Sequence, residues 1–313
     1  MAEKRERDIE VLITGFGPFL KFSENPSWLA IKDLHDSYLE PLALPCGAQA
    51  GTRGRIHIQT LQTSVCYSHV LDLVPRIHRQ AKPAGRVHRP FLDPLGEKPD
   101  ESGRGPQGNG RSFPEGYNVQ LPSEGRAAFD IVIHVGVGRP GNIAIEKVGH
   151  KRGYAKPDVK GELAPPATDQ HRNMLPSGPT EAERAEHDNF LKAGVAPTET
   201  TGTSIVRGFG EGFEQFPEEQ VNDVDVSALV DWLVKEKGLE NVRESRDAGR
   251  FLCDFIYYCS LSEAQRSANS EGEKTTVLFV HVPPTGEPHG TLDAQETVTS
   301  ITSWLASFRH HRR

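Results

Sequence analysis

The sequence predicts an α/β fold: a three-layer α/β/α sandwich with an open, largely parallel, twisted sheet and helices on both faces. Two observations lead to this class. Short apolar runs rich in β-branched residues, typical of strands buried on both faces, recur along the chain. Segments with apolar residues three and four positions apart, typical of helices, separate these runs. Alternating strands and helices form mainly parallel sheets, with functional sites at the carboxyl ends of the strands.

The first half of the chain supplies two strand–helix pairs. Asn25 and Pro26 predict a helix start, because Asn caps helix N-termini well and Pro suits the first helical position. Pro75 should end or kink the second helix. The expected elements are a strand at 9–14, a helix from 26 to about 38, a strand at 56–63 and a helix at 65–77.

The second half repeats the alternation. The runs FDIVIHV and TVLFVHV are nearly continuous in apolar residues, which predicts central strands. The segment NIAIEKV alternates as a strand does. The expected strands are 129–135, 142–148 and 276–282, and the expected helices are 226–234, closed by Gly238, then 251–261, and a last one carrying Val298, Ile301, Leu305 and Phe308.

Two stretches differ from the rest in composition. Residues 80–125 and 155–219 are polar and rich in Gly and Pro, so they offer too little apolar area to offset the entropy of ordering. About 200 residues remain, which is ample for one core. We therefore expect a single domain, 1–313, with a Gly/Pro-rich insertion at 80–125 and a second polar insertion at 155–219.

Composition excludes several classes of function. Acidic residues outnumber basic ones by 43 to 36, which disfavours general binding of nucleic acid. No apolar run reaches the roughly 20 residues that span a bilayer, and the charged start MAEKRERD does not predict a secretory signal. The four cysteines, which form no CxxC pair, favour a reducing, cytoplasmic location; they are Cys46, Cys66, Cys253 and Cys259.

The segment from Gly136 to Gly141 spells GxGxxG directly after a predicted strand, with Asp158 about 20 residues further on. A dinucleotide-binding fingerprint needs a helix to open at the third glycine, whereas the strand-like NIAIEKV follows here. Pro140 also stands inside the loop. A turn at the strand end is favoured, and a dinucleotide-binding oxidoreductase remains an alternative.

Cys253 is the cysteine best placed for chemistry. It stands in the first turn of a predicted helix, where the positive end of the macrodipole lowers a thiol's pKa and favours thiolate. A thiolate nucleophile needs a proton shuttle, and His281, His134 and His150 are all candidates. Glu146, an acid in an apolar stretch, could orient an imidazole. The residues alone leave the choice of histidine open.

Four segments together resemble the pyroglutamyl peptidase I (pyrrolidone-carboxylate peptidase) family of cysteine peptidases, and they come in that family's order. Compact members of the family lack the two insertions. The four segments are TGFGPF…NPS (14–27), HVGVG…IEKVGHKRGY (134–154), DAGRFLCDFIYYCSL (247–261) and FVHVPP (279–284).

The resemblance implies a catalytic triad of Glu146, Cys253 and His281, with His134 and His150 in supporting roles. It implies a thiol omega-peptidase that removes an N-terminal pyroglutamyl (5-oxoproline) residue from peptides through a thioester acyl-enzyme. Metal and organic cofactors are not required, and the partners are peptides with N-terminal pyroglutamate. The oligomeric state and the natural peptides stay open, and a non-catalytic relative that acts as a binding module remains a second alternative.

The resemblance also implies an apolar slot for the lactam ring, made by Phe16, Phe19 and Phe251, with Asn25 in a structural role behind it. Two positions depart from the bacterial pattern. Lys156 is the nearest match to a basic residue that many bacterial members have, which puts a role in anion stabilisation in doubt. Asp254 follows the cysteine where bacterial members often have Asn.

Overall fold

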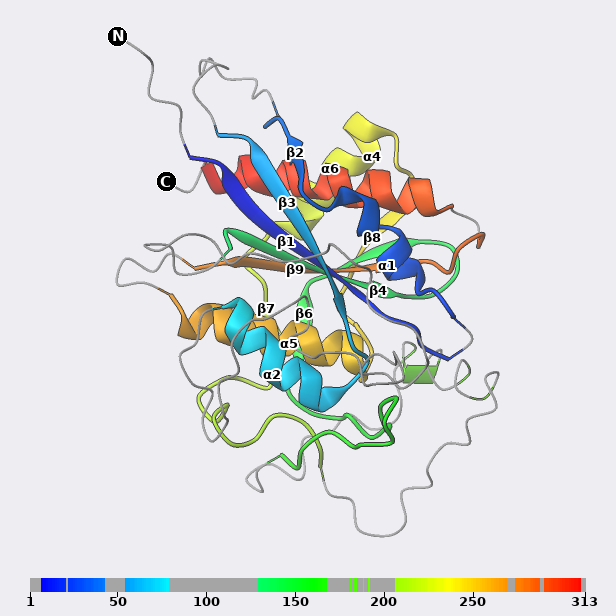
Figure 1. The fold of residues 1–313 in the computed structure, drawn as a ribbon, viewed down its shortest axis with the longest axis vertical. Coiled ribbons are helices and arrows are strands. Elements are labelled where there is room, and N and C mark those ends of the chain that lie inside the picture. Colours follow the sequence, from blue (N-terminus) through cyan, green and yellow to red (C-terminus); the bar gives the residue numbers. More distant parts are fainter. Residues whose placement is uncertain are drawn as a thin grey trace, which may run out of the picture.

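The structure, a computed structural model, describes residues 7–20, 22–42, 54–78, 129–167, 206–268, 274–287 and 290–310, and five residues between 181 and 191 (Figure 1). The main sheet contains β1 (Ile9–Phe16), β2 (Ser37–Leu39), β3 (Ile56–Thr63), β4 (Ile131–Val137), β5 (Ile143–Glu146), β8 (Val242–Ser245) and β9 (Thr276–Val282). The helices are α1 (Pro26–Leu29), α2 (Tyr67–Ile77), α4 (Val226–Lys237), α5 (Leu252–Arg266) and α6 (Thr291–His310), with a 3-10 turn, Lys32–Leu34. A second small sheet pairs β6 (Val148–His150) with β7 (Glu219–Val221).

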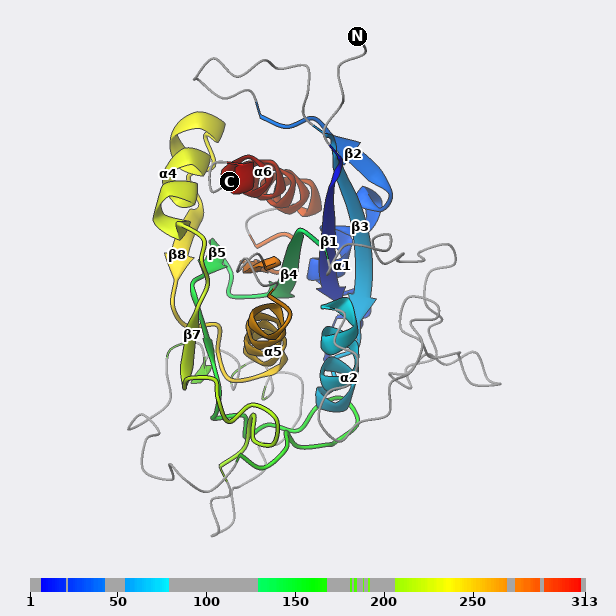
Figure 2. The ribbon, with the colours of Figure 1, turned by 90° about the vertical axis from the view of Figure 1, so that its left-hand side faces the viewer.

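The seven strands lie in the order β2-β3-β1-β4-β9-β5-β8. Four neighbouring pairs are parallel, and β2–β3 and β5–β9 are antiparallel. Helices α4 and α6 lie on one side of the sheet, and α2 and α5 lie on the other (Figures 1 and 2). The predicted α/β class with a largely parallel sheet and helices on both faces is confirmed.

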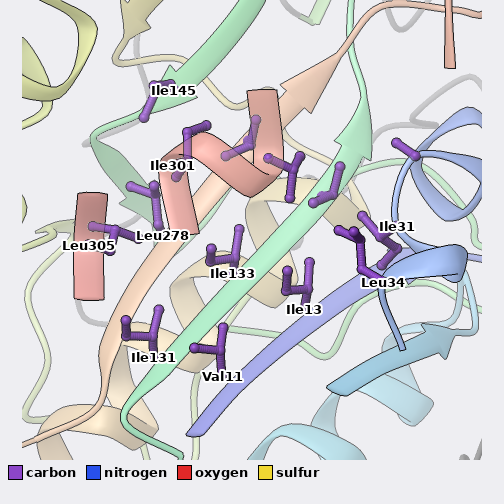
Figure 3. Packing of buried hydrophobic residues seen from close by; sticks show 14 of the residues in the cluster. Val11, Ile13, Ile31, Leu34, Ile131, Ile133, Ile145, Leu278, Ile301 and Leu305 are labelled. Carbon is purple, nitrogen blue, oxygen red and sulfur yellow. The ribbon is translucent and has the colours of Figure 1, made fainter. Parts of the chain in front are cut away.

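The first core fills the space between the sheet and helices α1, α4 and α6. Alternate residues of the central strands point to this side, as the pleat requires. Ile13 and Ile133 come from neighbouring strands, and Ile301 of α6 faces the same cluster (Figure 3). Each such side chain stabilises the fold by about 1.5–3 kcal/mol when it is fully buried.

The second core is aromatic and surrounds α5, a helix that is buried along most of its length. Phe255 of this helix stacks on Phe209 with ring centroids 4.2 Å apart. The residues at 155–167 and 206–219, the two ends of the second predicted insertion, contribute Ala164, Phe209, Phe213 and Phe216 to this core. The single-domain organisation with two insertions stays a prediction, and 80–125 lies outside the described residues.

Several elements differ from the sequence prediction. The helix expected from Pro26 to about Tyr38 ends at Leu29; the chain continues through the 3-10 turn and reverses at Asp36, whose φ is +54°, to add β2 to the edge of the sheet. The strand expected at 142–148 ends at Glu146, and the small β6–β7 sheet was not expected. The short edge strand β8 was not expected, since its VRES sequence has no run of apolar residues. In the described part of the chain, no helix combines the length and the apolarity needed to cross a membrane.

Candidate functional site

Three neighbouring strands, β4, β9 and β5, bring the main site residues together on the face of the sheet that α5 covers. Gly136 of β4 pairs with His281 of β9 in parallel register, and Glu146 of β5 pairs with Phe279 in antiparallel register. Since residues two apart on a strand share a face, Glu146 and His281 are diagonal neighbours across the β5–β9 ladder. The reversed direction of β5 therefore presents its last residue to the imidazole.

The imidazole of His281 is held between a carboxylate and a thiol. Its Nδ1 lies 2.8 Å from Oε1 of Glu146, whose side chain is buried. Burial lowers the pKa of His281, but hydrogen bonds to Cys253 and Glu146, together with their charges, outweigh burial and raise the pKa to about 10. The ring therefore carries a proton at neutral pH, and it faces a sulfur that the positive ring favours as thiolate.

Cys253 is the second residue of α5, and its side chain is half-buried. The residue before the helix, Phe251, gives no side-chain cap. Backbone N–H groups in a first helical turn lack partners within the helix, so this turn presents donors and partial positive charge beside the sulfur. The position combines an anion-stabilising helix end with a protonated imidazole.

Two glycines of β4 and the loop after it leave the space that this arrangement needs. A Cβ at Gly136 would lie 2.8 Å from the Cys253 sulfur, and a Cβ at Gly138 would lie 2.8 Å from the His281 Cβ. The chain then enters β5 at Ile143 and opens no helix. The first two glycines of the GxGxxG pattern thus leave room for the thiol and the imidazole, Gly141 adopts a φ of +105° in the turn, and the dinucleotide-binding alternative is not favoured. Sequence reasoning missed this role, because spacing alone does not show what a glycine faces.

The backbone carbonyl of Glu146 accepts hydrogen bonds from two side chains that were not identified from the sequence. The Tyr257 hydroxyl donates to the Glu146 carbonyl oxygen at 2.9 Å, and Asn222 Nδ2 donates to the same oxygen at 3.0 Å. Tyr257 stands one helical turn after Cys253, so the helix that carries the sulfur also grips the strand that carries the carboxylate. No sequence signal distinguishes Tyr257 from its equally buried neighbour Tyr258.

The other two candidate histidines have different partners. His134 is fully buried below Gly136 on β4, and its Nδ1 lies 2.7 Å from the Thr14 hydroxyl. Burial lowers the pKa of His134 to about 3, so this ring stays neutral. His150 contacts Asp254, with Nδ1 3.2 Å from Oδ1. The structure thus selects His281 as the histidine that contacts the cysteine.

The three phenylalanines expected to form the slot all belong to the second core. Phe16 and Phe251 are buried, whereas Phe19 is half-buried. The rings of Phe19 and Phe251 lie 5.5 Å apart, and Tyr67 meets Phe251 edge to face at 6.0 Å. Phe251 directly precedes the helix that carries Cys253, so this aromatic surface adjoins the thiol.

Asn25 shapes the loop that carries Phe16 and Phe19. Its Oδ1 accepts from the backbone N–H of Ser27, which caps α1, and its Nδ2 donates to the Gly17 carbonyl at 3.0 Å. The Ser27 hydroxyl accepts from the backbone N–H of Phe16 at 3.0 Å. The loop is thus fixed to the start of α1.

Lys156 and Asp158 lie at the start of α2. The hydroxyl of Tyr67, the first residue of that helix, donates to the Lys156 carbonyl at 2.9 Å. Asp158 Oδ2 accepts from the Tyr67 backbone N–H at 3.0 Å, so it caps the helix, a role that differs from binding a ribose. Within the described ranges, no group of three or more His, Cys, Asp or Glu side chains is placed to hold a metal ion.

Comparisons with known proteins point to one family. Pyroglutamyl-peptidase 1 of Homo sapiens is 24% identical to the chain over 282 residues, which cover 89% of this chain and 81% of that protein. This similarity confirms the predicted resemblance to the pyroglutamyl peptidase I family. No protein-family model matches the chain.

Solved structures show the same fold. The pyrrolidone carboxyl peptidase of Thermococcus litoralis superposes with a TM-score of 0.58 at 14% identity, over 97% of this chain and 96% of that one. Pyroglutamyl peptidase I of Bacillus amyloliquefaciens gives 0.51 at 17% identity, over 96% and 97%. The described residues of this chain thus share the α/β fold of these two peptidases.

Proposed function

We propose that this protein is a thiol peptidase that removes an N-terminal pyroglutamyl residue from peptides. The observation that carries the proposal is the hydrogen-bonded series Glu146–His281–Cys253, with the cysteine at a helix N-terminus. The relatives named as pyroglutamyl peptidases support the substrate class. The catalytic assignments are Cys253 as nucleophile, His281 as general acid and base, and Glu146 as the group that orients the imidazole.

Acylation begins with attack of the Cys253 thiolate on the carbonyl carbon that joins pyroglutamate to the next residue. The S–C bond forms, and the oxygen becomes an oxyanion that accepts from the backbone N–H of Cys253 in the first turn of α5. The protonated His281 gives its proton to the leaving nitrogen as the C–N bond breaks. A peptide with a free amino terminus leaves, and a thioester remains.

Deacylation returns the protein to its starting state. The now neutral His281 takes a proton from water while the water oxygen attacks the thioester carbon. The C–S bond breaks, pyroglutamate leaves, and sulfur is again a thiolate beside a protonated ring. The bond from His281 Nδ1 to Glu146 turns Nε2 toward the sulfur and stabilises the imidazolium in both half-reactions.

The substrate has no free α-amino group, so recognition cannot rely on a charge at its N-terminus. An apolar slot with a few backbone hydrogen bonds suits a lactam ring. We assign that slot to Phe16, Phe19 and Phe251, of which Phe19 is the most accessible. Aromatic burial of one small ring supplies a few kcal/mol of binding free energy. Because the slot reads only the first residue, many second residues should be accepted.

The proposal also covers the cellular location of the protein and its partners. Free cysteines at Cys66, Cys253 and Cys259 fit a reducing, cytoplasmic location, and the partners are peptides blocked by pyroglutamate. A single peptidase domain with two insertions is the organisation that we propose for the whole chain. A non-catalytic binding module would retain the ligand without cleaving it, which the following experiment distinguishes.

The test uses a fluorogenic pyroglutamyl amide as reporter. We expect Cys253→Ala to abolish release of the fluorophore while circular dichroism and Tm remain close to those of the unchanged protein. Cys259→Ala, which removes a buried thiol from the same helix, is the matched control and should retain activity. Full activity in folded Cys253→Ala would remove the cysteine from the mechanism. Absence of cleavage by the unchanged protein, with pyroglutamyl peptide bound, would indicate a binding module.

A further inference from the structure

Asp254, the residue after the proposed nucleophile, has no part in the mechanism above, yet its side chain is fully buried. A buried carboxylate is costly unless hydrogen bonds or opposite charges compensate. Its position in the first turn of α5 gives a favourable interaction with the helix dipole, which offsets part of that cost. The partners of this carboxylate therefore need an explanation.

Most of those partners come from one segment, the stretch that follows Glu146. Oδ1 accepts from the backbone N–H of His150 at 3.2 Å and lies 3.2 Å from Nδ1 of the same residue. Oδ2 lies 3.0 Å from the hydroxyl of Tyr154, which also contacts the His150 carbonyl oxygen. Arg250, just before the helix, places Nη1 3.8 Å from Oδ2.

These contacts connect the segment that carries Glu146 to the helix that carries Cys253. Glu146 ends β5, and His150 ends β6 only four residues later, so a tie to His150 fixes the chain that carries the Glu146 carboxylate. Cys253 and Asp254 are adjacent in α5, so the same tie fixes the sulfur. The bond from Tyr257 to the Glu146 carbonyl is a second tie between the same segments, one helical turn away.

We propose that Asp254 is a positioning residue that, through His150 and Tyr154, sets the place of the Cys253 sulfur relative to the Glu146–His281 pair. The inference deepens the proposed function and rests on it. The carboxylate acts through its acceptor oxygens, and the cationic Arg250 compensates part of its buried charge.

Two substitutions distinguish the effect of the hydrogen bonds that Asp254 makes from the effect of its charge. Asp254→Asn keeps an acceptor for the His150 N–H and a donor for the Tyr154 hydroxyl, but it removes the charge. Asp254→Ala removes the hydrogen bonds as well as the charge. If position matters, kcat should fall by roughly tenfold or more in Asp254→Ala, with KM changed less than about twofold, and Asp254→Asn should stay within about threefold of the unchanged protein. Glu263→Gln, at another buried acid of α5, is the matched control and should leave kcat unchanged.

A second readout does not depend on peptide cleavage. The rate at which iodoacetamide alkylates Cys253, measured on its own peptide by mass spectrometry, reports whether the thiolate still lies beside His281. It should fall in Asp254→Ala and be retained in Asp254→Asn. If the unchanged protein cleaves no reporter, the proposed function fails, while the alkylation series still tests the positioning role.

Three results would overturn the inference. Folded Asp254→Ala with unchanged kcat and alkylation rate would do so, as would equal changes in Asp254→Ala and Asp254→Asn, which would point to charge alone. If Asp254→Ala does not fold, Tyr154→Phe replaces it. We expect Tyr154→Phe to lose about threefold in kcat. Tyr258→Phe, which removes a hydroxyl that donates to the Pro217 carbonyl, is the control and should retain kcat. Full kcat in Tyr154→Phe would refute the role.

Discussion

Glu146 and His281 meet at 2.8 Å as diagonal neighbours on the antiparallel strands β5 and β9. The pair depends on the reversal of β5 in an otherwise largely parallel sheet. A parallel β5 would place Glu146 at a different register against β9. The direction of one four-residue strand thus sets which carboxylate reaches the imidazole.

Substitution of Glu146 by Gln should lower kcat by roughly 10²-fold, since the oriented and charge-stabilised imidazolium is lost. The side chain keeps its size, so we expect Tm to change little. Glu244→Gln, on the neighbouring strand β8, removes an acid that is far more exposed and serves as the control. Steady-state kinetics with the pyroglutamyl reporter check the expectation, and an unchanged kcat would exclude Glu146 from the mechanism.

The pH profile should reflect the raised pKa of His281. Burial lowers that pKa, but hydrogen bonds and charges from Cys253 and Glu146 outweigh burial and raise it from 6.5 to about 10, so the proposed acid for the leaving amine keeps its proton well above neutrality. We expect kcat/KM to decline only as the pH approaches 10. In Glu146→Gln the decline should begin at lower pH, because one cause of the raised pKa is removed. Coincident alkaline limbs in the two proteins would contradict this.

The raised pKa of His281 also makes the free energy of unfolding depend on pH. Because the folded pKa of His281 exceeds the unfolded value of 6.5, the contribution of its protonated ring is complete below pH 6.5 and is lost as the pH rises through about 10. Urea unfolding of the unchanged protein and of His281→Gln should therefore give a stability difference that narrows over this range.

The buried neutral histidines predict the opposite dependence in acid. Burial lowers the pKa of His69, His78 and His134 to about 3 each, so the unfolded chain binds more protons below pH 6.5. The free energy of unfolding should fall by up to about 1.4 kcal/mol per pH unit for each of them. Replacing His134 by Gln should make the slope shallower, and urea titrations at pH 7, 6 and 5 measure it. An unchanged slope would argue against a depressed pKa.

A methyl group at Gly136 should disable the site without a change in any charged group. Its Cβ would lie 2.8 Å from the Cys253 sulfur and 2.8 Å from Cζ of Phe279, so sulfur or ring must move. We expect Gly136→Ala to lower kcat/KM by roughly 10²-fold. Gly290→Ala, where the nearest atom is 3.8 Å away, should be silent. Wild-type activity in Gly136→Ala would show that the sulfur has more freedom than this packing allows.

Removal of the Tyr257 hydroxyl tests the support behind Glu146. Tyr257→Phe loses a donor to the Glu146 carbonyl, which costs about 1 kcal/mol of stability and should lower kcat severalfold. Tyr258→Phe loses a comparable bond to Pro217, outside the triad, so it should lose stability without the drop in kcat. Equal kcat values in the two variants would remove Tyr257 from the support of the site.

Local sequence signals predicted much of the fold. β9 begins and ends where the apolar run TVLFVHV does, and Gly238 ends α4 in a left-handed conformation, as predicted. The edge strand β2 was missed because its formation depends on pairing with β3, which no local pattern encodes.

The site was predicted from family resemblance more than from residue physics. Strand-end position alone left His134, His150 and His281 equivalent, and only the tertiary register decides that His281 pairs with Gly136 and faces the cysteine. Asp254 and Tyr257 were not identified as supports, because their partners lie about a hundred residues away in the chain.

The contact between Gly136 and the Cys253 sulfur also bears on the direction of approach to the sulfur. One flank of the sulfur is covered by the backbone of β4, so we expect a planar amide to approach the sulfur from the opposite flank. An inhibitor that mimics the tetrahedral adduct should therefore place its bulk on that opposite flank.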